Sequence, residues 1–133
     1  MNPPSEDIKD MLVAESELGL IFATNLFIGK EPDLPNDCVV IFDTYGYPPM
    51  MVLEGSGNYF YPAVNIRVRH HHYSTGIQLA QQIVTALHGR HGETWNGARY
   101  TSIVCQNDPG LLEWDENNRV SFSINFQLQR KEE

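Results

Sequence analysis

Residues 59–87 constrain the fold most strongly, because a β-strand pattern passes directly into a helix pattern within this stretch. The even positions of residues 60–68 are all compatible with a buried face: Phe60, Pro62, Val64, Ile66 and Val68. This period of two predicts a strand, and its odd positions, which become increasingly basic, predict a face for solvent or a partner. Farther along, the apolar spacing changes to three and four residues, in Ile77, Ala80, Ile83, Val84 and Leu87. It predicts an amphipathic helix that begins at an N-cap of Ser74 or Thr75, ends at Gly89 and covers the sheet.

The rest of the chain adds an N-terminal helix and further strands to this unit. The helix is expected within residues 1–18, with Ser5 as its N-cap, and the strands at residues 20–28, 38–42, 99–106, 111–114 and 120–129. Residues 43–57 are interpreted as one long, partly mobile loop, and residues 93–97 as a turn. The order α-β-β-β-α-β-β-β predicts a single α+β domain over residues 1–133, with a mostly antiparallel sheet packed against one or two helices.

The charge of the chain argues against tight binding to nucleic acid. Its formal net charge is -8 at pH 7, and ten of its seventeen acidic residues lie in residues 1–62, which hold only two lysines. Proteins that bind DNA or RNA tightly need clustered lysine and arginine, although DNA can pass an acidic surface without binding. No apolar run approaches the roughly 20 residues that span a bilayer, so no membrane partner is expected.

The cysteines and the start of the chain predict a protein that is made in the cytoplasm. Cys38 and Cys105 are flanked by aliphatic residues in predicted strands, and we interpret them as buried thiols. The first residues lack the basic and apolar regions of a signal peptide.

Histidines and acids are the main candidates for chemistry. His70, His71 and His72 are consecutive, and because alternate strand residues share a face, one metal could bind His70 and His72. Acids that lie mostly in predicted loops could form a magnesium site: Glu31, Asp33, Asp37, Asp43 and Glu54. Asp43, directly after a predicted buried strand, is the best candidate among them. No HExxH, CxxC, GxSxG or phosphate-binding glycine loop is present. We therefore predict no catalytic, cofactor-binding or metal-binding residue, and the alternative is a metal-dependent nuclease or hydrolase.

Tyrosines and arginines on the odd face of the predicted strand at residues 59–69 are the candidate protein interface. Both residue types are enriched at interface hot spots. Two tyrosines of the neighbouring predicted loop complete the set, which is Tyr59, Tyr61, Asn65, Arg67, Arg69, Tyr45 and Tyr47.

Several segments of the chain resemble the tail terminator proteins of tailed double-stranded DNA phages, which are also known as minor capsid proteins. The segments are residues 22–32 (FATNLFIGKEP), 38–44 (CVVIFDT), 61–62 (YP), 80–81 (AQ), 87–89 (LHG), 93–97 (ETWNG) and 122–126 (FSINF). The resemblance covers most of residues 20–130, and its motifs are structural rather than catalytic.

The resemblance implies a virion protein without enzyme activity or cofactor. It implies a subunit that forms a ring, expected to be a hexamer, which caps the tail tube, ends its polymerisation and joins it to the head connector. Its implied partners are other copies of itself, the tail tube protein, the connector or neck protein, and DNA that passes without sequence-specific binding. Another head–tail neck ring protein and a monomeric ligand-binding domain remain as alternatives.

Overall fold

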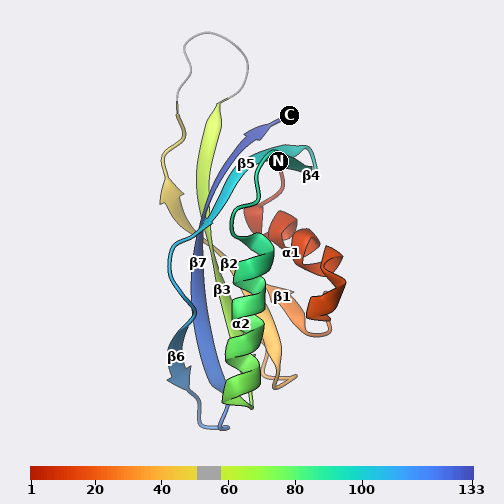
Figure 1. Cartoon of the computed structure of the whole chain (residues 1–133), viewed down its shortest axis with the longest axis vertical. Coiled ribbons are helices and arrows are strands. Elements are labelled where there is room, and N and C mark those ends of the chain that lie inside the picture. The colour runs from red at the N-terminus through yellow and green to blue at the C-terminus, as the bar shows by residue number, and fades with distance from the viewer. Residues whose placement is uncertain (51–57) are drawn as a thin grey trace.

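The computed structural model describes residues 1–50 and 58–133, in which two helices lie against one curled sheet (Figure 1). The helical segments are α1 (Pro4–Ala14), the 3-10 turn η1 (Ser16–Leu18) and α2 (Tyr73–Leu87). The strands are β1 (Leu26–Ile28), β2 (Cys38–Tyr47), β3 (Tyr59–His70), β4 (Glu93–Trp95), β5 (Ala98–Cys105), β6 (Gly110–Trp114) and β7 (Val120–Glu132). Neither described helix is long and apolar enough to cross a membrane.

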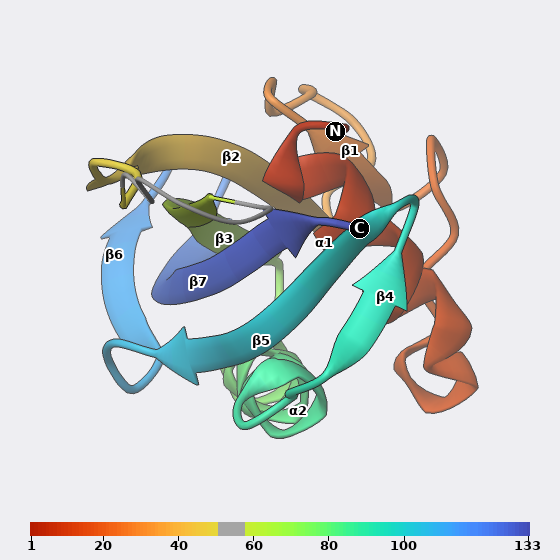
Figure 2. The same cartoon turned by 90° about the horizontal axis from the view of Figure 1, so that it is seen from above.

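The strands run in the order β1-β2-β3-β7-β5-β4, and β6 pairs with β7 beside β5. β3 pairs along one side of β7. On the other side, β5 pairs with the second half of β7 and β6 with its first four residues. All pairings are antiparallel except that of β1 with β2, which is parallel. The α+β prediction is therefore confirmed, with a sheet that is mixed at one edge. Seen from above, the sheet curls around the helices (Figure 2).

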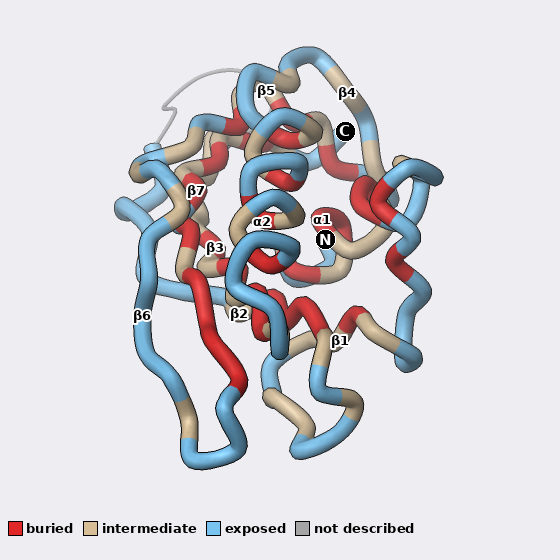
Figure 3. Tube along the Cα trace, turned by 60° about the horizontal axis from the view of Figure 1, so that its bottom comes forward, coloured by how far each residue is buried: buried red, intermediate tan, exposed pale blue. Residues whose placement is uncertain are grey.

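The core lies between the sheet and the two helices, as the alternation of β3 and β7 predicts. Val64, Ile66 and Val68 of β3 are fully buried and pair with Phe126, Ile124 and Phe122 of β7, which are also fully buried. From α2 the fully buried residues are Ala80, Ile83 and Leu87, while Ile77 and Val84 pack at the margin of the core. Figure 3 shows the buried segments on the inner sides of these elements.

Both predicted helix starts are wrong. Pro3 occupies the N-cap of α1 and His72 that of α2, and neither helix has a side-chain cap of its own. The predicted end of α2 is confirmed, because Gly89 follows the C-cap residue His88 with a left-handed φ of 88°.

Two predicted loops and one predicted strand also differ from the structure. Residues 43–47 continue β2 instead of opening a loop, and residues 51–57 of that predicted loop, including Glu54, lie outside the described residues. Residues 93–95 form the short strand β4, and the turn shrinks to Asn96 and Gly97, whose φ angles are 51° and 80°. Residues 20–25 are irregular, so only the last three residues of the predicted strand 20–28 form β1.

Candidate assembly surfaces

Most of the large apolar side chains that are exposed among the described residues gather in three places. We call these the arm, the β6 patch and the β1 patch. The arm is the outer end of the β2–β3 hairpin, residues 44–50 and 59–62. The β6 patch is Tyr73, Leu111, Leu112 and Trp114. The β1 patch is the exposed Ile21 and Phe22 with the half-buried Phe27 beside them. Exposed apolar side chains that cluster in this way mark sites of contact with other molecules.

The arm lies at one end of the sheet, where the first residues of β3 still pair with the last residues of β7 (Figure 1). Tyr45 is fully exposed and Tyr47 is 71% exposed, whereas Tyr59 and Tyr61 are half-buried. Between the two tyrosines of β2, Gly46 lies so close to β3 that a Cβ atom would stand 1.9 Å from the carbonyl oxygen of Tyr61. A shift in register between Thr44 and Tyr47 marks the same point. Gly46 therefore allows the strands of the arm to approach, and the tyrosines beside it point outward.

Three predicted interface residues in the second half of β3, Asn65, Arg67 and Arg69, form hydrogen bonds or ion pairs with other residues of the same subunit. Asn65 donates hydrogen bonds to Ser123 Oγ at 2.7 Å and to Asn125 Oδ1 at 2.9 Å on β7. Arg67 pairs with Glu31 at 3.1 Å.

Arg69 is only 5% exposed and donates to the backbone carbonyls of Asp33, Pro35 and Asn36. Arg69 lies on the predicted outer face of β3, but residues 29–37 fold back over this end of the sheet and cover it, so it is not exposed as expected.

The β6 patch forms at one edge of the sheet, where β6 meets the start of α2. Trp114 stacks on Tyr73 with ring centroids 6.4 Å apart, and Tyr73 meets the buried Phe122 edge-on at 5.2 Å. Trp114 is nevertheless 51% exposed and Leu111 is 53% exposed. The rings of Tyr73 and Trp114 are thus held in place by contact with the core, while about half of Trp114 remains exposed to water.

The β1 patch forms at the opposite edge, around the irregular segment before β1. Phe22 is 46% exposed, and the ammonium of Lys9 lies 4.8 Å from the centre of its ring. Phe22, Phe27 and Lys30 help to line a pocket of about 540 Å³.

The acid that best suited a magnesium site, Asp43, has a structural partner. Its carboxylate accepts hydrogen bonds from the backbone N–H of Ser5 at 3.0 Å and from the Ser5 hydroxyl at 2.7 Å. Since the first N–H groups of a helix have no partner within the helix, Asp43 acts as the missing cap of α1 from a neighbouring strand.

The histidine cluster is built differently from the predicted one. Asp37, rather than His72, completes a set with His70 and His71 whose ligand atoms lie within 4.8 Å of one another. Asp37 Oδ1 lies 2.6 Å from His71 Nδ1, and the His72 N–H donates to His70 Nδ1 at 2.9 Å. Burial lowers the pKa of His70 by more than nearby Asp37 raises it. In the neutral ring, Nδ1 of His70 is thus used as an acceptor, and the proton on Nε2 faces Asp37, 3.5 Å away.

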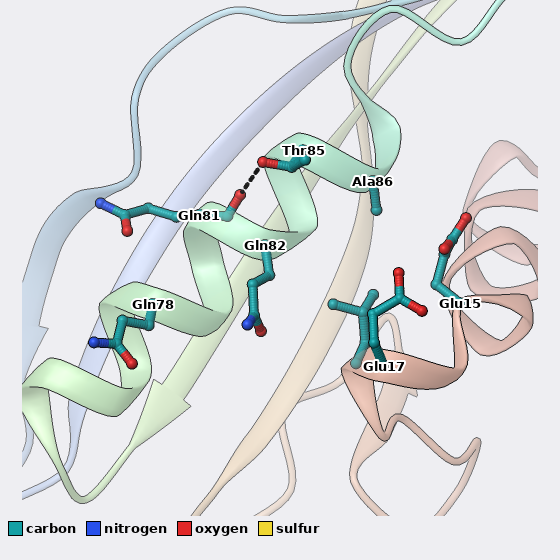
Figure 4. A pocket seen from close by; sticks show the side chains of 8 residues that line it. Glu15, Glu17, Gln78, Gln81, Gln82, Thr85 and Ala86 are labelled. Carbon is teal, nitrogen blue, oxygen red and sulfur yellow. Dashed lines mark hydrogen bonds between the residues drawn. The ribbon is translucent and has the colours of Figure 1, made fainter.

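The groove between α2 and the η1 segment is a further hollow on the described surface (Figure 4). It has a volume of about 540 Å³ and is lined mainly by glutamates and glutamines: Glu15, Glu17, Leu18, Gln78, Gln81, Gln82, Thr85 and Ala86. The Thr85 hydroxyl is occupied, because it donates to the carbonyl of Gln81 at 3.1 Å. These groups offer hydrogen bonds but no nucleophile with an adjacent base.

Comparison with known proteins identifies the family to which the chain belongs. The family model described as "Bacteriophage tail terminator protein" matches residues 6–132, nearly the whole chain. The chain belongs to the bacteriophage tail terminator family. A chain of a solved structure, "Virion of native gene transfer agent (GTA) particle", has the same fold, with a TM-score of 0.68 and 13% identity over 96% of this chain and 93% of that chain. No curated protein matches the sequence.

As a member of the tail terminator family, the chain is a structural virion protein, and the resemblance seen in its sequence is confirmed. Sequence reasoning missed the β6 and β1 patches as surfaces. One signal was present: Leu111 and Leu112 are adjacent apolar residues in a strand of five residues, which places apolar side chains on both faces. The β1 patch gave no such signal, because its apolar residues match a buried strand equally well.

Proposed function

We propose that this tail terminator protein acts by docking, as a ring that caps the tail tube, ends its polymerisation and joins it to the head connector. The observation that carries the proposal is the presence of three separate apolar surfaces on one small subunit. A catalytic domain gathers its polar groups in one cleft. A ring subunit at the end of a tube instead needs two surfaces for its neighbours and a further one for the tube or connector.

The arm is the surface that we assign to the tube or the connector. Its two most exposed tyrosines lie outside the core, so they can contact a neighbouring molecule without disturbing the core. Tyrosine suits this role, because its ring buries a large area on binding and its hydroxyl stays satisfied in water before binding. We expect Tyr45 and Tyr47 to supply most of the contact, with Tyr59 and Tyr61 supporting it from β3.

The acidic character of the chain fits the passage of DNA through such a ring. A net charge of -8 repels the phosphate backbone, so DNA would pass without sequence-specific binding. We place the ring in the virion, at the junction of tail and head, after assembly in the host cytoplasm. The nuclease alternative loses its best residue, since the carboxylate of Asp43 caps α1.

Electron microscopy of the purified protein mixed with tail tubes tests this proposal. The wild-type protein should appear as a ring on one end of each tube and should prevent further growth when tube subunits are added. The Tyr45→Ser/Tyr47→Ser variant should fold and still form rings but leave the tube ends bare. Val13→Ser, which changes an apolar side chain of α1 that is 43% exposed, is the matched control and should behave as the wild type. Tubes that keep growing with no added density at either end would contradict the proposal.

A further inference from the structure

The two edge patches lie at the same level of the sheet, on opposite sides of the subunit. Strand register shows this, because one continuous line of paired residues crosses the sheet from edge to edge. The line runs through Leu26 of β1, Val39 of β2, Val68 of β3, Phe122 of β7 and Leu111 of β6. Four strand spacings separate the two edges, which is about 19 Å before the curl of the sheet is considered. Figure 3 likewise shows β6 and β1 on opposite sides of α2.

The two patches also differ in shape. The β6 patch presents side chains: Trp114 is 51% exposed and braced from behind by Tyr73, and Leu112 is 46% exposed. The β1 patch adjoins the pocket of about 540 Å³ that Phe22 and Phe27 help to line. The pocket has apolar residues on one part of its wall and charged residues on another. A braced aromatic ring suits the apolar part, and a buried aromatic anchor of this type is typical of an interface hot spot.

The two edges of the sheet also differ in the sign of their unpaired charges. Glu113 of β6 and Glu116 in the turn after it are exposed, and neither has an ion-pair partner in the described part of the chain. At the other edge, the pocket is lined in part by Lys30, Glu31 and Asp33. Both acids have arginine partners within the subunit, whereas the exposed Lys30 has no ion pair with any described residue. An unpaired acid on one edge and an unpaired lysine on the other would attract when two copies meet edge to edge.

We infer that the β6 patch of one subunit docks on the β1 patch of a second copy of this chain, with Trp114 entering the pocket beside Phe22 and Glu113 facing Lys30. The contact is head-to-tail, since it joins two different surfaces. A head-to-tail contact closes into a ring when successive subunits stay level and grows into a helix when they rise. Patches at one level of the sheet favour the closed ring. This inference rests on the proposed ring and names the surfaces that close it.

Two single variants and their mixture test the contact. Trp114→Ser removes the docking side chain, Phe22→Ser changes the pocket, and both residues are about half exposed, so both variants should keep the fold by circular dichroism. Native mass spectrometry of the free proteins and electron microscopy on tail tubes should show a loss of rings for each variant. The mixture should yield one-to-one dimers and no rings, because each pair retains one intact patch of each kind. Val13→Ser is again the control and should keep its rings.

Three outcomes would overturn the inference while leaving the ring itself in place. They are rings from either single variant, rings from the mixture, and a mixture that stays monomeric while the wild type assembles. If wild-type protein forms no ring, free or on tubes, the proposed function fails first.

A charge exchange gives an independent check of orientation. Lys30→Glu should weaken assembly at low salt, and adding Glu113→Lys to the same chain should restore it. A double variant as weak as Lys30→Glu alone would contradict the pairing of these two residues.

Discussion

Asp7 is the residue at which we expect a single charge removal to be most costly for folding. It belongs to α1, is fully buried, and accepts hydrogen bonds from the hydroxyl of Tyr100 on β5 and from Nδ2 of Asn96 at 2.7 Å. Nη1 of Arg130 on β7 lies 3.4 Å from the same carboxylate, and Arg130 is only 8% exposed. This cluster attaches α1 to the sheet through Asp7, Tyr100 and Arg130, which are all buried, with the exposed Asn96 at its margin. Burial and the hydrogen bond to Asp7 also raise the pKa of Tyr100, which keeps its hydroxyl protonated as a donor.

Asp7→Ala should lower the free energy of unfolding by about 3–5 kcal/mol, because it leaves the Arg130 guanidinium buried without its counter-charge. The carbonyl of Asn2, which accepts from Arg130 at 2.8 Å, is a neutral partner and does not replace the carboxylate. A typical neutral hydrogen bond contributes only about 1 kcal/mol, so the size of the loss distinguishes an unpaired buried charge from a lost hydrogen bond.

Urea denaturation at pH 7, followed by circular dichroism, measures this loss. Asp10→Ala on the same helix is the matched control, since Asp10 is partly exposed and pairs with Lys9 at the surface; its loss should stay below about 1 kcal/mol. The double variant Asp7→Leu/Arg130→Met should recover most of the stability, because both charges leave the interior together. Equal stability of Asp7→Ala and Asp10→Ala would refute the reasoning.

Three further predictions concern other contacts of the fold. Phe122→Ala should cost about 3–5 kcal/mol in the same urea assay, because the ring is fully buried under α2; a loss below 1 kcal/mol would contradict its place in the core. Asp43→Ala should cost about 1 kcal/mol through the lost cap on Ser5, with helix content by circular dichroism as the readout. Burial raises the pKa of Asp37, but hydrogen bonds from the ring and backbone of His71 outweigh it, so the folded pKa lies below the usual 3.8. Its stabilisation should be present above about pH 4 and disappear as the pH falls through that lowered pKa. The urea midpoints of wild type and Asp37→Asn should therefore differ at pH 6 and approach each other as the pH falls below 3.8.

Local periodicity was sufficient to predict the centre of the fold. Alternation places Val64, Ile66 and Val68 on one face of β3 whatever lies beside them, and a spacing of three and four residues does the same for Ile83 and Leu87 of α2. These properties follow from the geometry of single strands and helices. The predicted α+β class depended on such local patterns and on their order along the chain, and the structure confirms it.

Chain segments whose role depends on distant partners were predicted less well. Residues 43–47 are polar and contain Gly46, so their sequence resembles a loop, yet pairing with β3 holds them as a strand. Arg69 occupies a position that is outward on an isolated β3, but residues 29–37 cover it and bond its guanidinium. Asp43 follows a buried run and resembles a catalytic acid, whereas Ser5 in the first turn of α1, 38 positions earlier in the chain, uses it as a cap.

The sequence by itself determined which faces of the central elements are apolar, and it carried enough of the family pattern to indicate a tail terminator. Only the tertiary structure decided which strands lie at the edges of the sheet and which apolar side chains stay exposed there. Leu111 of the β6 patch and Leu26, which forms a bridge with Phe22, are placed at opposite edges of one level by four successive strand pairings. Strand order and register are set by packing between distant segments. Since a subunit that assembles into a ring works through its edges, its docking surfaces emerge only once the sheet has formed.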